Sequence, residues 1–221
     1  MNIYNSNILH LCDQQGISVT EFENIIYIPK IRIMDPTPNE LVRIAEYFNL
    51  PLDVIVLKDL KQTQKFDKSK FKLVILDVDG TMTDGGMYFT ENGDQMKRYN
   101  AKDGLAIKRL VKEGIVFGII SHGKKLKVVQ DRADLLGIQK VYVGSEPKLG
   151  ILNEWLKELD IKLEETVYVG DDLNDMDIIE AVGMSACPGD AVAGVKSKVD
   201  IILRKDGGQA CIRELIDEWL S

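Results

Sequence analysis

The segment FKLVILDVDGTMTD, Phe71 to Asp84, restricts the possible folds of this chain more than any other stretch. Its unbroken apolar run Leu73 to Leu76 is typical of a strand buried on both faces, as in a parallel sheet. The run leads Asp77 and Asp79 into a turn at Gly80, where both carboxylates can converge on one small volume. Such crowding is unfavourable unless a cation or a phosphoryl group compensates it. The segment therefore predicts a metal site; the alternative, solvated acids in a β-turn, explains most isolated Asp-X-Asp patterns.

Composition narrows the class of protein. The 221 residues are 45% hydrophobic and 29% charged, which is ordinary for one globular domain, or one domain with a small attachment. No apolar run reaches membrane-spanning length and the N-terminus lacks a signal-peptide pattern, so we expect a cytoplasmic enzyme without membrane contact. The net charge of −7 opposes a broad nucleic-acid surface. The three cysteines are widely spaced and indicate neither a disulfide framework nor a zinc site.

Residues 61–70, KQTQKFDKSK, are polar, rich in lysine and without apolar periodicity. This pattern predicts a linker, with a small helical module at 1–60 before it and a larger domain at 71–221 after it.

In the larger domain, strand-like apolar runs alternate with amphipathic helical stretches. This order predicts βαβ units, and hence an α/β fold with a Rossmann-like parallel sheet covered by helices on both faces. The expected strands are 72–77, 115–120, 141–144, 166–171, 184–187 and 199–203, and the expected helices are 103–113, 124–136, 148–158, 174–182 and 209–220.

One segment interrupts the alternation. In MYFTENGDQMKRY, residues 87–99, Asn92-Gly93 lies between two alternating stretches and predicts a hairpin with a type I′ turn. Because the hairpin follows the strand that leads to Asp77, we expect it to overhang the ligand-binding edge as a flap. Simple extension of the sheet is the alternative.

Polar residues recur at the expected carboxyl ends of the strands, where ligands collect in open α/β sheets. The first strand ends at Asp77, the second at Ser121, a helix after the third begins at Lys148, and a later strand ends in GDDLND, Gly170 to Asp175. Together they offer a nucleophile, a hydroxyl for an anion, a cation and a second acidic cluster.

These motifs, DVDGT at 77–81, IIS at 119–121, Lys148 and GDDLND, resemble those of haloacid dehalogenase superfamily phosphatases. The resemblance implies that Asp77 attacks phosphorus to form an aspartyl-phosphate, and that Asp79 protonates the leaving alcohol and then activates water. It also implies Mg2+ as cofactor. The implied metal ligands are the Asp77 carboxylate, the Asp79 main-chain carbonyl and Asp171, and the implied phosphate-binding residues are Thr81, Ser121 and Lys148.

The implied chemistry agrees with simple electrostatics. A carboxylate and a phosphate dianion repel each other, so a metal ion and an ammonium group must neutralise their encounter. Asp79 favours a phosphate ester over a carbon–halogen bond, because a leaving alcohol needs a proton and a leaving halide does not. Asp172 and Asp175 are expected to orient water and Lys148, although Asp175 is equally explained as an acid at a helix N-terminus.

Many members of this superfamily carry a cap domain inserted after the first or the second motif, but residues 84–103 and 121–148 are too short to hold one. The site is therefore expected to be open, with a large substrate or a neighbouring subunit shielding it. The detailed pattern over about 70–220 resembles the capless phosphatases of 3-deoxy-octulosonate 8-phosphate and nonulosonate 9-phosphates. That resemblance implies a sugar acid phosphate as substrate and a homotetramer in which one subunit's hairpin and C-terminal tail border a neighbour's site. The implied substrate-binding residues are Asn100, Lys102, Asp103, Gly104, Lys108 and Arg132, with solvated helix faces as the alternative for the three basic ones.

The chain departs from this family in two places. After the second motif, His122-Gly123-Lys124-Lys125 replaces a common Gly-Arg, and Gln209 stands where an arginine is common near the C-terminus. Both positions bear on which sugar acid is selected. His122 is interpreted as a residue making local hydrogen bonds, with substrate contact as the alternative.

Residues 1–60 carry a different signal. ILHLCDQQGISVTEF and PTPNELVRIAEYFNLPLDVIV resemble the first and last helices of a Cro/repressor-type helix-turn-helix domain, but only NIIYIPKIRIMD lies between them. Four basic against eight acidic residues give this part a charge of −4, which opposes contact with a phosphate backbone. We therefore expect a degenerate module used for oligomer contacts or packing, with the run Ile25 to Ile33 as an interface. The alternative function is a DNA-binding regulator that senses a phosphorylated metabolite.

Overall fold

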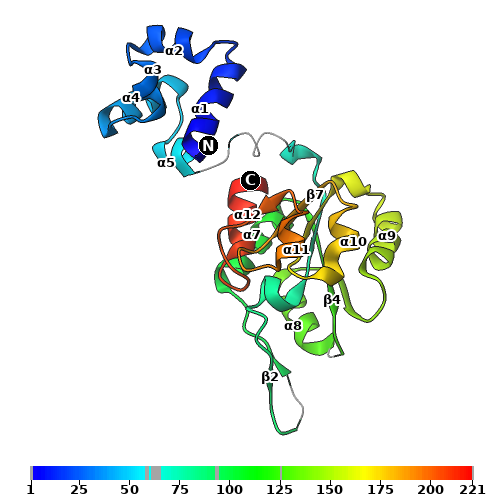
Figure 1. The fold of residues 1–221 in the computed structure, drawn as a ribbon. Helices are drawn as coiled ribbons and strands as arrows, with labels where there is room; N and C mark the ends of the chain where they lie inside the picture. The colour runs from blue at the N-terminus through cyan, green and yellow to red at the C-terminus, as the bar shows by residue number, and fades with distance from the viewer. Residues whose placement is uncertain (1, 58–59, 61–65, 93–94, 125, 221) are drawn as a thin grey trace. The chain divides into compact units, whose positions relative to one another are not determined.

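The chain divides into two compact units, Met1–Phe66 and Asp67–Ser221 (Figure 1). The computed structural model describes residues 2–57, 60, 66–92, 95–124 and 126–220. Of the predicted linker, residues 61–65 lie outside the described part, and Lys68–Lys70 form a short 3-10 turn, η1. No helix in the described ranges combines the length and apolar character needed to cross a bilayer.

The larger unit is built on one six-stranded sheet, with the strand order β5-β4-β1-β6-β7-β8. Every neighbouring pair in it is parallel. The predicted α/β fold is thus confirmed, and β1 lies in the middle of the sheet with all four residues buried. The strands are β1 Leu73–Leu76, β4 Val116–His122, β5 Lys140–Gly144, β6 Thr166–Val169, β7 Met184–Cys187 and β8 Ile201–Ile202.

Helices cover both faces of the sheet. Figure 1 shows α7 and α12 on one side and α9 and α10 on the other. The helices are α7 Ala101–Lys112, α8 Leu126–Leu136, α9 Lys148–Leu159, α10 Met176–Ile179, α11 Ala193–Lys196 and α12 Cys211–Leu215. Shorter turns are η2 Val78–Met82, η3 Leu163–Glu165, η4 Leu173–Asp175 and η5 Ile216–Leu220. The predicted helix 174–182 is wrong in its length, because η4 and α10 end by Ile179, and α11 was not predicted.

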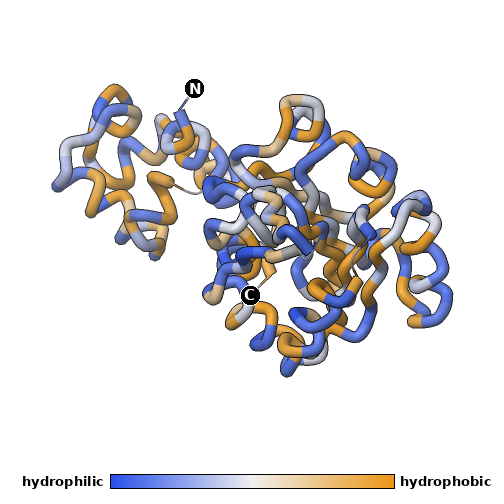
Figure 2. Tube along the Cα trace, turned by 90° about the horizontal axis from the view of Figure 1, so that it is seen from below, coloured by the Kyte–Doolittle hydropathy of each residue, from blue (hydrophilic) through white to orange (hydrophobic). Residues whose placement is uncertain are grey.

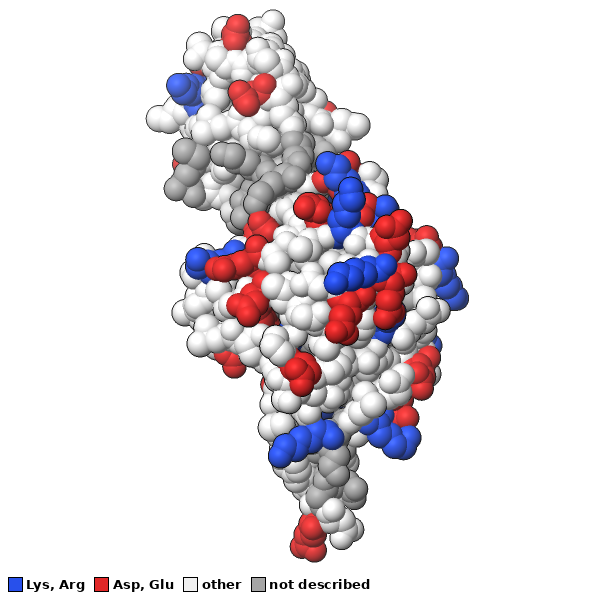
Figure 3. All heavy atoms as spheres, turned by 90° about the vertical axis from the view of Figure 1, so that its right-hand side faces the viewer, with Lys and Arg blue, Asp and Glu red and all other residues white. Residues whose placement is uncertain are grey.

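Burial of apolar side chains between the sheet and its helices holds this unit together. On one face, Ile75 and Tyr168 from the sheet pack with Leu152 of α9 and Ile178 of α10, all fully buried. Figure 2 shows hydrophobic stretches running through the interior of this unit and hydrophilic ones at its rim. On the face seen in Figure 3, acidic and basic side chains are interspersed.

The predicted hairpin forms a separate two-stranded sheet, β2 Tyr88–Phe89 with β3 Gln95–Met96, so it does not extend the main sheet. Figure 1 shows it projecting from the body of the unit. The predicted turn at Asn92-Gly93 falls partly outside the described residues. Met87, Phe89 and Met96 are each about 60% exposed, so the hairpin presents an apolar surface.

In its described residues, the smaller unit is a cluster of five helices around an apolar core that includes Ile8, Phe22, Ile33, Ile44 and Ile55, all fully buried. Its helices are α1 Ile3–Gln14, α2 Val19–Ile26, α3 Lys30–Met34, α4 Pro38–Phe48 and α5 Leu52–Leu57. Ser18 and Thr37 begin α2 and α4 with capping boxes, which satisfy backbone amides that a helix start leaves unpaired.

The apolar run Ile25 to Ile33 divides between the core and the surface. Ile26, Ile28 and Ile33 are buried, whereas Tyr27 and Ile31 are 86% and 78% exposed. The run therefore contributes to the core of the smaller unit and also leaves a small apolar patch exposed.

Candidate active site

Three carboxylates meet at the carboxyl edge of the sheet. Asp77 directly follows β1, while Asp171 and Asp175 lie in the segment that follows β6. Each offers an oxygen, and these oxygens all lie within 4.8 Å of one another. Parallel strands bring residues 94 positions apart in sequence to the same edge, which is why the cluster forms.

Gly80 allows the loop after β1 to approach Asp171. Its φ is +88°, a conformation that residues with a Cβ rarely adopt. A Cβ at this position would lie 2.1 Å from Asp171 Oδ2, far inside van der Waals contact. Only glycine therefore fits between the two acidic segments.

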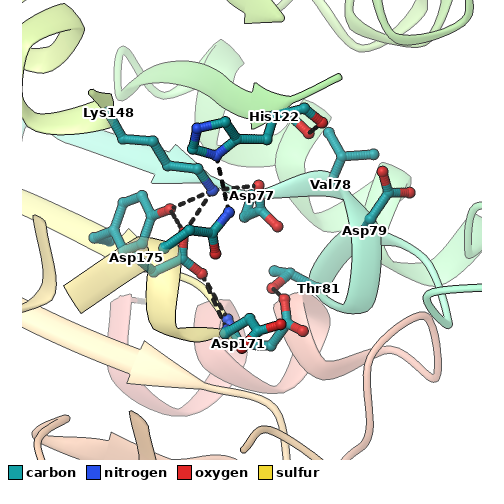
Figure 4. A network of polar contacts seen from close by, with 12 residues as sticks. Asp77, Val78, Asp79, Thr81, His122, Lys148, Asp171 and Asp175 are labelled. Atoms are coloured by element: carbon teal, nitrogen blue, oxygen red, sulfur yellow. Dashed lines mark hydrogen bonds and ion pairs between the residues drawn. The ribbon is translucent and has the colours of Figure 1, made fainter. Parts of the chain in front are cut away.

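Lys148 is the cation of the cluster. It is the first residue of α9, its side chain is 2% exposed, and its Nζ donates to Asp77 Oδ1 at 2.7 Å and to Asp175 Oδ1 at 2.5 Å. Figure 4 shows the ammonium reaching between these two carboxylates. Nζ also donates to Tyr168 Oη at 3.4 Å. The ammonium thus lies directly beside the predicted nucleophile.

Asp175 links the ammonium to the second acidic segment. Its Oδ1 accepts from Lys148 and from Tyr168 Oη, the latter at 2.6 Å. Its Oδ2 accepts from the backbone amides of Asp171 at 2.9 Å and of Asp172 at 3.3 Å (Figure 4). Both oxygens are occupied and the side chain is fully buried, so Asp175 supports the site from behind.

The electrostatics of the cluster favour a bound cation. Burial raises the pKa of Asp77 to about 7, against the opposing effect of the Lys148 ammonium and with the help of Asp175 and Asp171. Burial is also the main reason why the pKa of Asp171 is raised to about 6. For Lys148, burial lowers the pKa, but Asp77 and Asp175 outweigh it and the net shift is upward. One ammonium among three carboxylates leaves negative charge that a divalent ion would offset.

Asp79 lies at one side of this cluster and forms an ion pair with Lys97, which follows β3 of the hairpin. A small cavity opens beside Asp79. Its wall combines charged, polar and apolar residues: Asp79, Met87, Lys97, Ser121, His122, Gly123, Lys124, Val129 and Val143. The cavity places Lys124, where the family commonly has arginine, near the predicted acid/base.

The two hydroxyls predicted to bind phosphate have other contacts in this structure. Thr81 is fully buried, and its Oγ1 donates to Asp171 Oδ1 at 3.0 Å, which orients that carboxylate. Ser121 is 3% exposed, its Oγ donates to the His122 carbonyl at 3.3 Å, and it also lines the cavity. Of these two residues, Ser121 lines the cavity and Thr81 does not.

Four of the six predicted substrate-binding residues are engaged in packing around the start of α7. Asn100 caps α7 by accepting from the Lys102 amide and donates to the Gly208 carbonyl. Asp103 accepts from the Arg213 amide at 2.7 Å, and burial raises the pKa of its carboxyl to about 6. These contacts fasten α7 to the segment that begins α12.

Arg132 and Gly104 complete that packing. The Arg132 guanidinium donates to the Asn100 carbonyl at 3.1 Å and lies 5.2 Å from the centre of the Tyr99 ring. A Cβ at Gly104 would lie 2.6 Å from Arg132 Nη2, so the glycine gives the arginine its space. Arg132 therefore has a structural explanation within one chain.

The remaining two, Lys102 and Lys108, lie on the surface of α7. Lys102 is exposed, and Lys108 lines a different groove, together with Leu105, Arg109, Lys112 and Arg213. Neither lysine lines the cavity beside Asp79. Within one chain, the structure does not bring these residues to the acidic cluster.

Sequence reasoning missed Lys97, Tyr168 and the hydrogen bond between Asn174 Nδ2 and His122 Nδ1, which are 2.9 Å apart. Tyr168 is hidden in the apolar strand β6, and its hydroxyl offers no sequence signal. Lys97 directly follows β3, and its pairing with Asp79 depends on the tertiary path of the chain, which the local sequence does not indicate. The His122 contact agrees with its interpretation as a residue making local hydrogen bonds.

Comparison with known proteins identifies relatives of the larger unit. Residues 141–211 match the haloacid dehalogenase-like hydrolase family. The chain is similar to the 3-deoxy-D-manno-octulosonate 8-phosphate phosphatase KdsC of Escherichia coli K12, with 39% identity over 146 residues, which cover 66% of this chain and 77% of the relative.

Solved structures agree. The phosphatase of the same name from Yersinia pestis superposes with a TM-score of 0.69 at 35% identity, covering 73% of this chain and 85% of that one. The Moraxella catarrhalis phosphatase, solved with magnesium, phosphate and KDO, gives a TM-score of 0.66 at 32% identity over 70% of this chain and 87% of its own. This chain belongs to the KdsC-type phosphatases of the haloacid dehalogenase superfamily.

Proposed function

We propose that this protein is a Mg2+-dependent phosphatase that hydrolyses the phosphate monoester of a sugar acid, 3-deoxy-octulosonate 8-phosphate or a nonulosonate 9-phosphate. The observation that carries the proposal is the buried Asp77 carboxylate, which lies against the Lys148 ammonium and within reach of Asp171. Relatives named for the octulosonate phosphate, at 39% identity, support the substrate class.

The donor set suits magnesium, which prefers oxygen ligands and keeps several waters. The Asp77 and Asp171 carboxylates and the Asp79 main-chain carbonyl would hold the ion. Asp175 is the third acid of the cluster, but its two oxygens already accept four hydrogen bonds, so we assign it a supporting role. When bound, the metal supplies positive charge that offsets the phosphoryl oxygens.

The chain's own groups then carry the reaction. An Asp77 carboxylate oxygen attacks phosphorus, the P–O bond to the sugar breaks, and Asp79 gives its proton to the leaving alcohol oxygen. Water then attacks the aspartyl-phosphate while Asp79 takes up a water proton, which frees inorganic phosphate and restores Asp77. Lys148 neutralises both the nucleophile and the transferring phosphoryl group.

The phosphoryl group is expected to contact Lys148, the Ser121 hydroxyl and main-chain groups near Thr81. Because the Thr81 hydroxyl already donates to Asp171, we assign its side chain to orienting that carboxylate. The leaving sugar acid would occupy the cavity beside Asp79, where Lys124 offers a cation for the substrate carboxylate.

We further propose that the protein acts as a homo-oligomer, a tetramer in keeping with the family resemblance. The exposed apolar side chains of the hairpin, Met87, Tyr88, Phe89 and Met96, would be covered by another subunit. Contributions of Lys102, Lys108 and Arg132 to substrate binding would then require a neighbouring copy or a movement of α7 and α8.

We assign residues 1–60 to packing or assembly, separate from a linker at 61–70 and the phosphatase domain at 71–221. The helix α3, where a repressor would place its recognition helix, has five residues, and its Ile31 is 78% exposed. The −4 charge of residues 1–60 adds to the case against DNA binding. Absence of binding to DNA at low salt would eliminate that alternative.

The proposed function is tested by measuring the release of inorganic phosphate from eight- and nine-carbon sugar acid phosphates. Each assay is run once with Mg2+ and once with a chelator. We expect Mg2+-dependent turnover that Asp77→Asn abolishes. Near-normal hydrolysis by Asp77→Asn would contradict the mechanism. Turnover confined to phosphates of sugars that lack a carboxylate would contradict the substrate class.

A further inference from the structure

We propose that Lys97 is a positioning residue that holds the Asp79 carboxylate in place for proton exchange with the leaving group. The inference rests on the proposed function, because it assigns to Asp79 the role of acid and base. It adds a residue from outside the four motifs to the working site.

The first observation is the contact itself. Lys97 Nζ forms an ion pair with Asp79 Oδ1, and the Lys97 side chain is only 8% exposed while that of Asp79 is 28% exposed. An ammonium held so far from water needs a compensating partner. In the described part of the chain, Asp79 is the acidic side chain that pairs with it. Removal of Asp79 would leave the Lys97 charge without a compensating partner in a place where water reaches it poorly.

The second observation is the setting of Asp79. It lies in η2 with φ −81° and ψ 116°, next to Gly80, so the regular backbone of a helix or strand does not fix its side chain. A proton donor must lie within about 2.6–3.2 Å of the atom that receives the proton. Lys97 supplies the contact that restricts where the carboxylate lies.

The third observation is that both residues face the same cavity, whose wall also includes Ser121 and Lys124. The proposed leaving group would lie there. Lys97 follows β3, so the hairpin delivers to this cavity the side chain that orients the acid/base.

The neighbouring residue provides a matched control. Arg98 also pairs with an acid of the loop after β1, Asp84, at 2.8 Å, but its side chain is 62% exposed. Neither partner of that pair lines the cavity beside Asp79. Loss of the Arg98 pair therefore removes a second tether of the hairpin without touching the acid/base.

The experiment compares Lys97→Met, Lys97→Arg and Arg98→Met on two esters in Mg2+: a sugar acid phosphate, whose alcohol leaves poorly without a proton, and p-nitrophenyl phosphate, whose phenolate leaves readily. General acid catalysis contributes about 10²–10⁴-fold, so we expect Lys97→Met to lower kcat on the alkyl ester about 10-fold or more. On the aryl ester the loss caused by Lys97→Met should stay below about threefold. Lys97→Arg should recover part of the activity that Lys97→Met loses on the alkyl ester. Arg98→Met should change kcat on either ester by less than about twofold.

A double-mutant cycle with Asp79→Asn separates positioning from a general structural effect. If Lys97 acts through Asp79, adding Lys97→Met to Asp79→Asn produces no further loss on the alkyl ester. Equal losses on both esters, or losses that multiply in the double variant, would overturn the inference. Melting temperatures identify a variant that fails to fold, in which case Lys97→Gln takes its place.

The two proposals fail differently. If the wild-type protein cleaves other alkyl phosphates but no sugar acid phosphate, the substrate assignment is wrong, and the Lys97 comparison is made on the alkyl ester that is cleaved. If Asp79→Asn loses no activity on that ester, the inference about Lys97 is overturned as well.

Discussion

Gly80 and Asp171 lie so close that a methyl group on Gly80 would stand 2.1 Å from Asp171 Oδ2. The contact joins the loop after β1 to the segment after β6, and it sets the separation of the acidic residues that we assign to the metal.

Gly80→Ala should therefore abolish or nearly abolish Mg2+-dependent turnover, because the added Cβ must push Asp171 away. Gly114→Ala is the matched control: its φ is +97°, but a Cβ there would have no atom within 4 Å. Both variants incur the strain of a positive φ, about 1–3 kcal/mol, so both should melt earlier. Only Gly80→Ala should lose Mg2+ affinity in a titration, and equal Mg2+ affinity in the two would contradict this reading.

Asp77→Asn should eliminate turnover without lowering the melting temperature in metal-free buffer. The wild-type carboxylate is buried among Asp171 and Asp175, and burial raises its pKa to about 7. Replacing it with a neutral amide removes a buried charge, although the amide oxygen that can still accept from Lys148 no longer attracts the ammonium as an anion. A large drop in melting temperature would show that the Asp77–Lys148 pair is needed for folding.

Metal-free stability should depend on pH in a direction set by the raised pKa values. Asp77 and Asp171 have ordinary values of 3.8 and shift to about 7 and about 6, so the folded state binds protons more tightly than the unfolded state. The stability that these two groups contribute to the folded state is fully present below about pH 4 and is lost as the pH rises to about 7.

The free energy of unfolding is measured for the wild type and Asp77→Asn by urea titration at pH 4.5 and pH 7.5 with a chelator. The difference between the two proteins isolates the part of this contribution that depends on Asp77. We expect the wild type to lose stability relative to the variant over this range, and Mg2+ at pH 7.5 to restore it. No change in the difference would show that the cluster stays ionised throughout.

Tyr168→Phe should lower kcat about fivefold, since the loss of one buried hydrogen bond is worth about 1 kcal/mol. The variant removes the hydroxyl that shares Asp175 Oδ1 with Lys148. Tyr142→Phe, in which the lost hydroxyl accepts only from the Glu146 amide, is the matched control and should retain kcat. If the two variants lose activity equally, Tyr168 has no special role in the site.

The sequence alone determined the fold class and the residues of the acidic cluster. Unbroken apolar runs and amphipathic helical stretches are local patterns, and they specify βαβ units wherever they alternate. The motifs at Asp77, Lys148 and Asp171 followed strand ends or helix starts, which parallel topology brings to one edge.

Only the tertiary structure decided which side chains contact one another. Arg132, assigned to substrate by resemblance, stacks on Tyr99 and binds the Asn100 carbonyl, because the packing of α8 on α7 directs it there. Lys97 reaches Asp79 because the chain returns from the projecting hairpin to the loop after β1 directly behind β3. Such contacts depend on long-range packing that no local periodicity encodes, so the sequence identified the chemistry of the site and the fold supplied the side chains that position it.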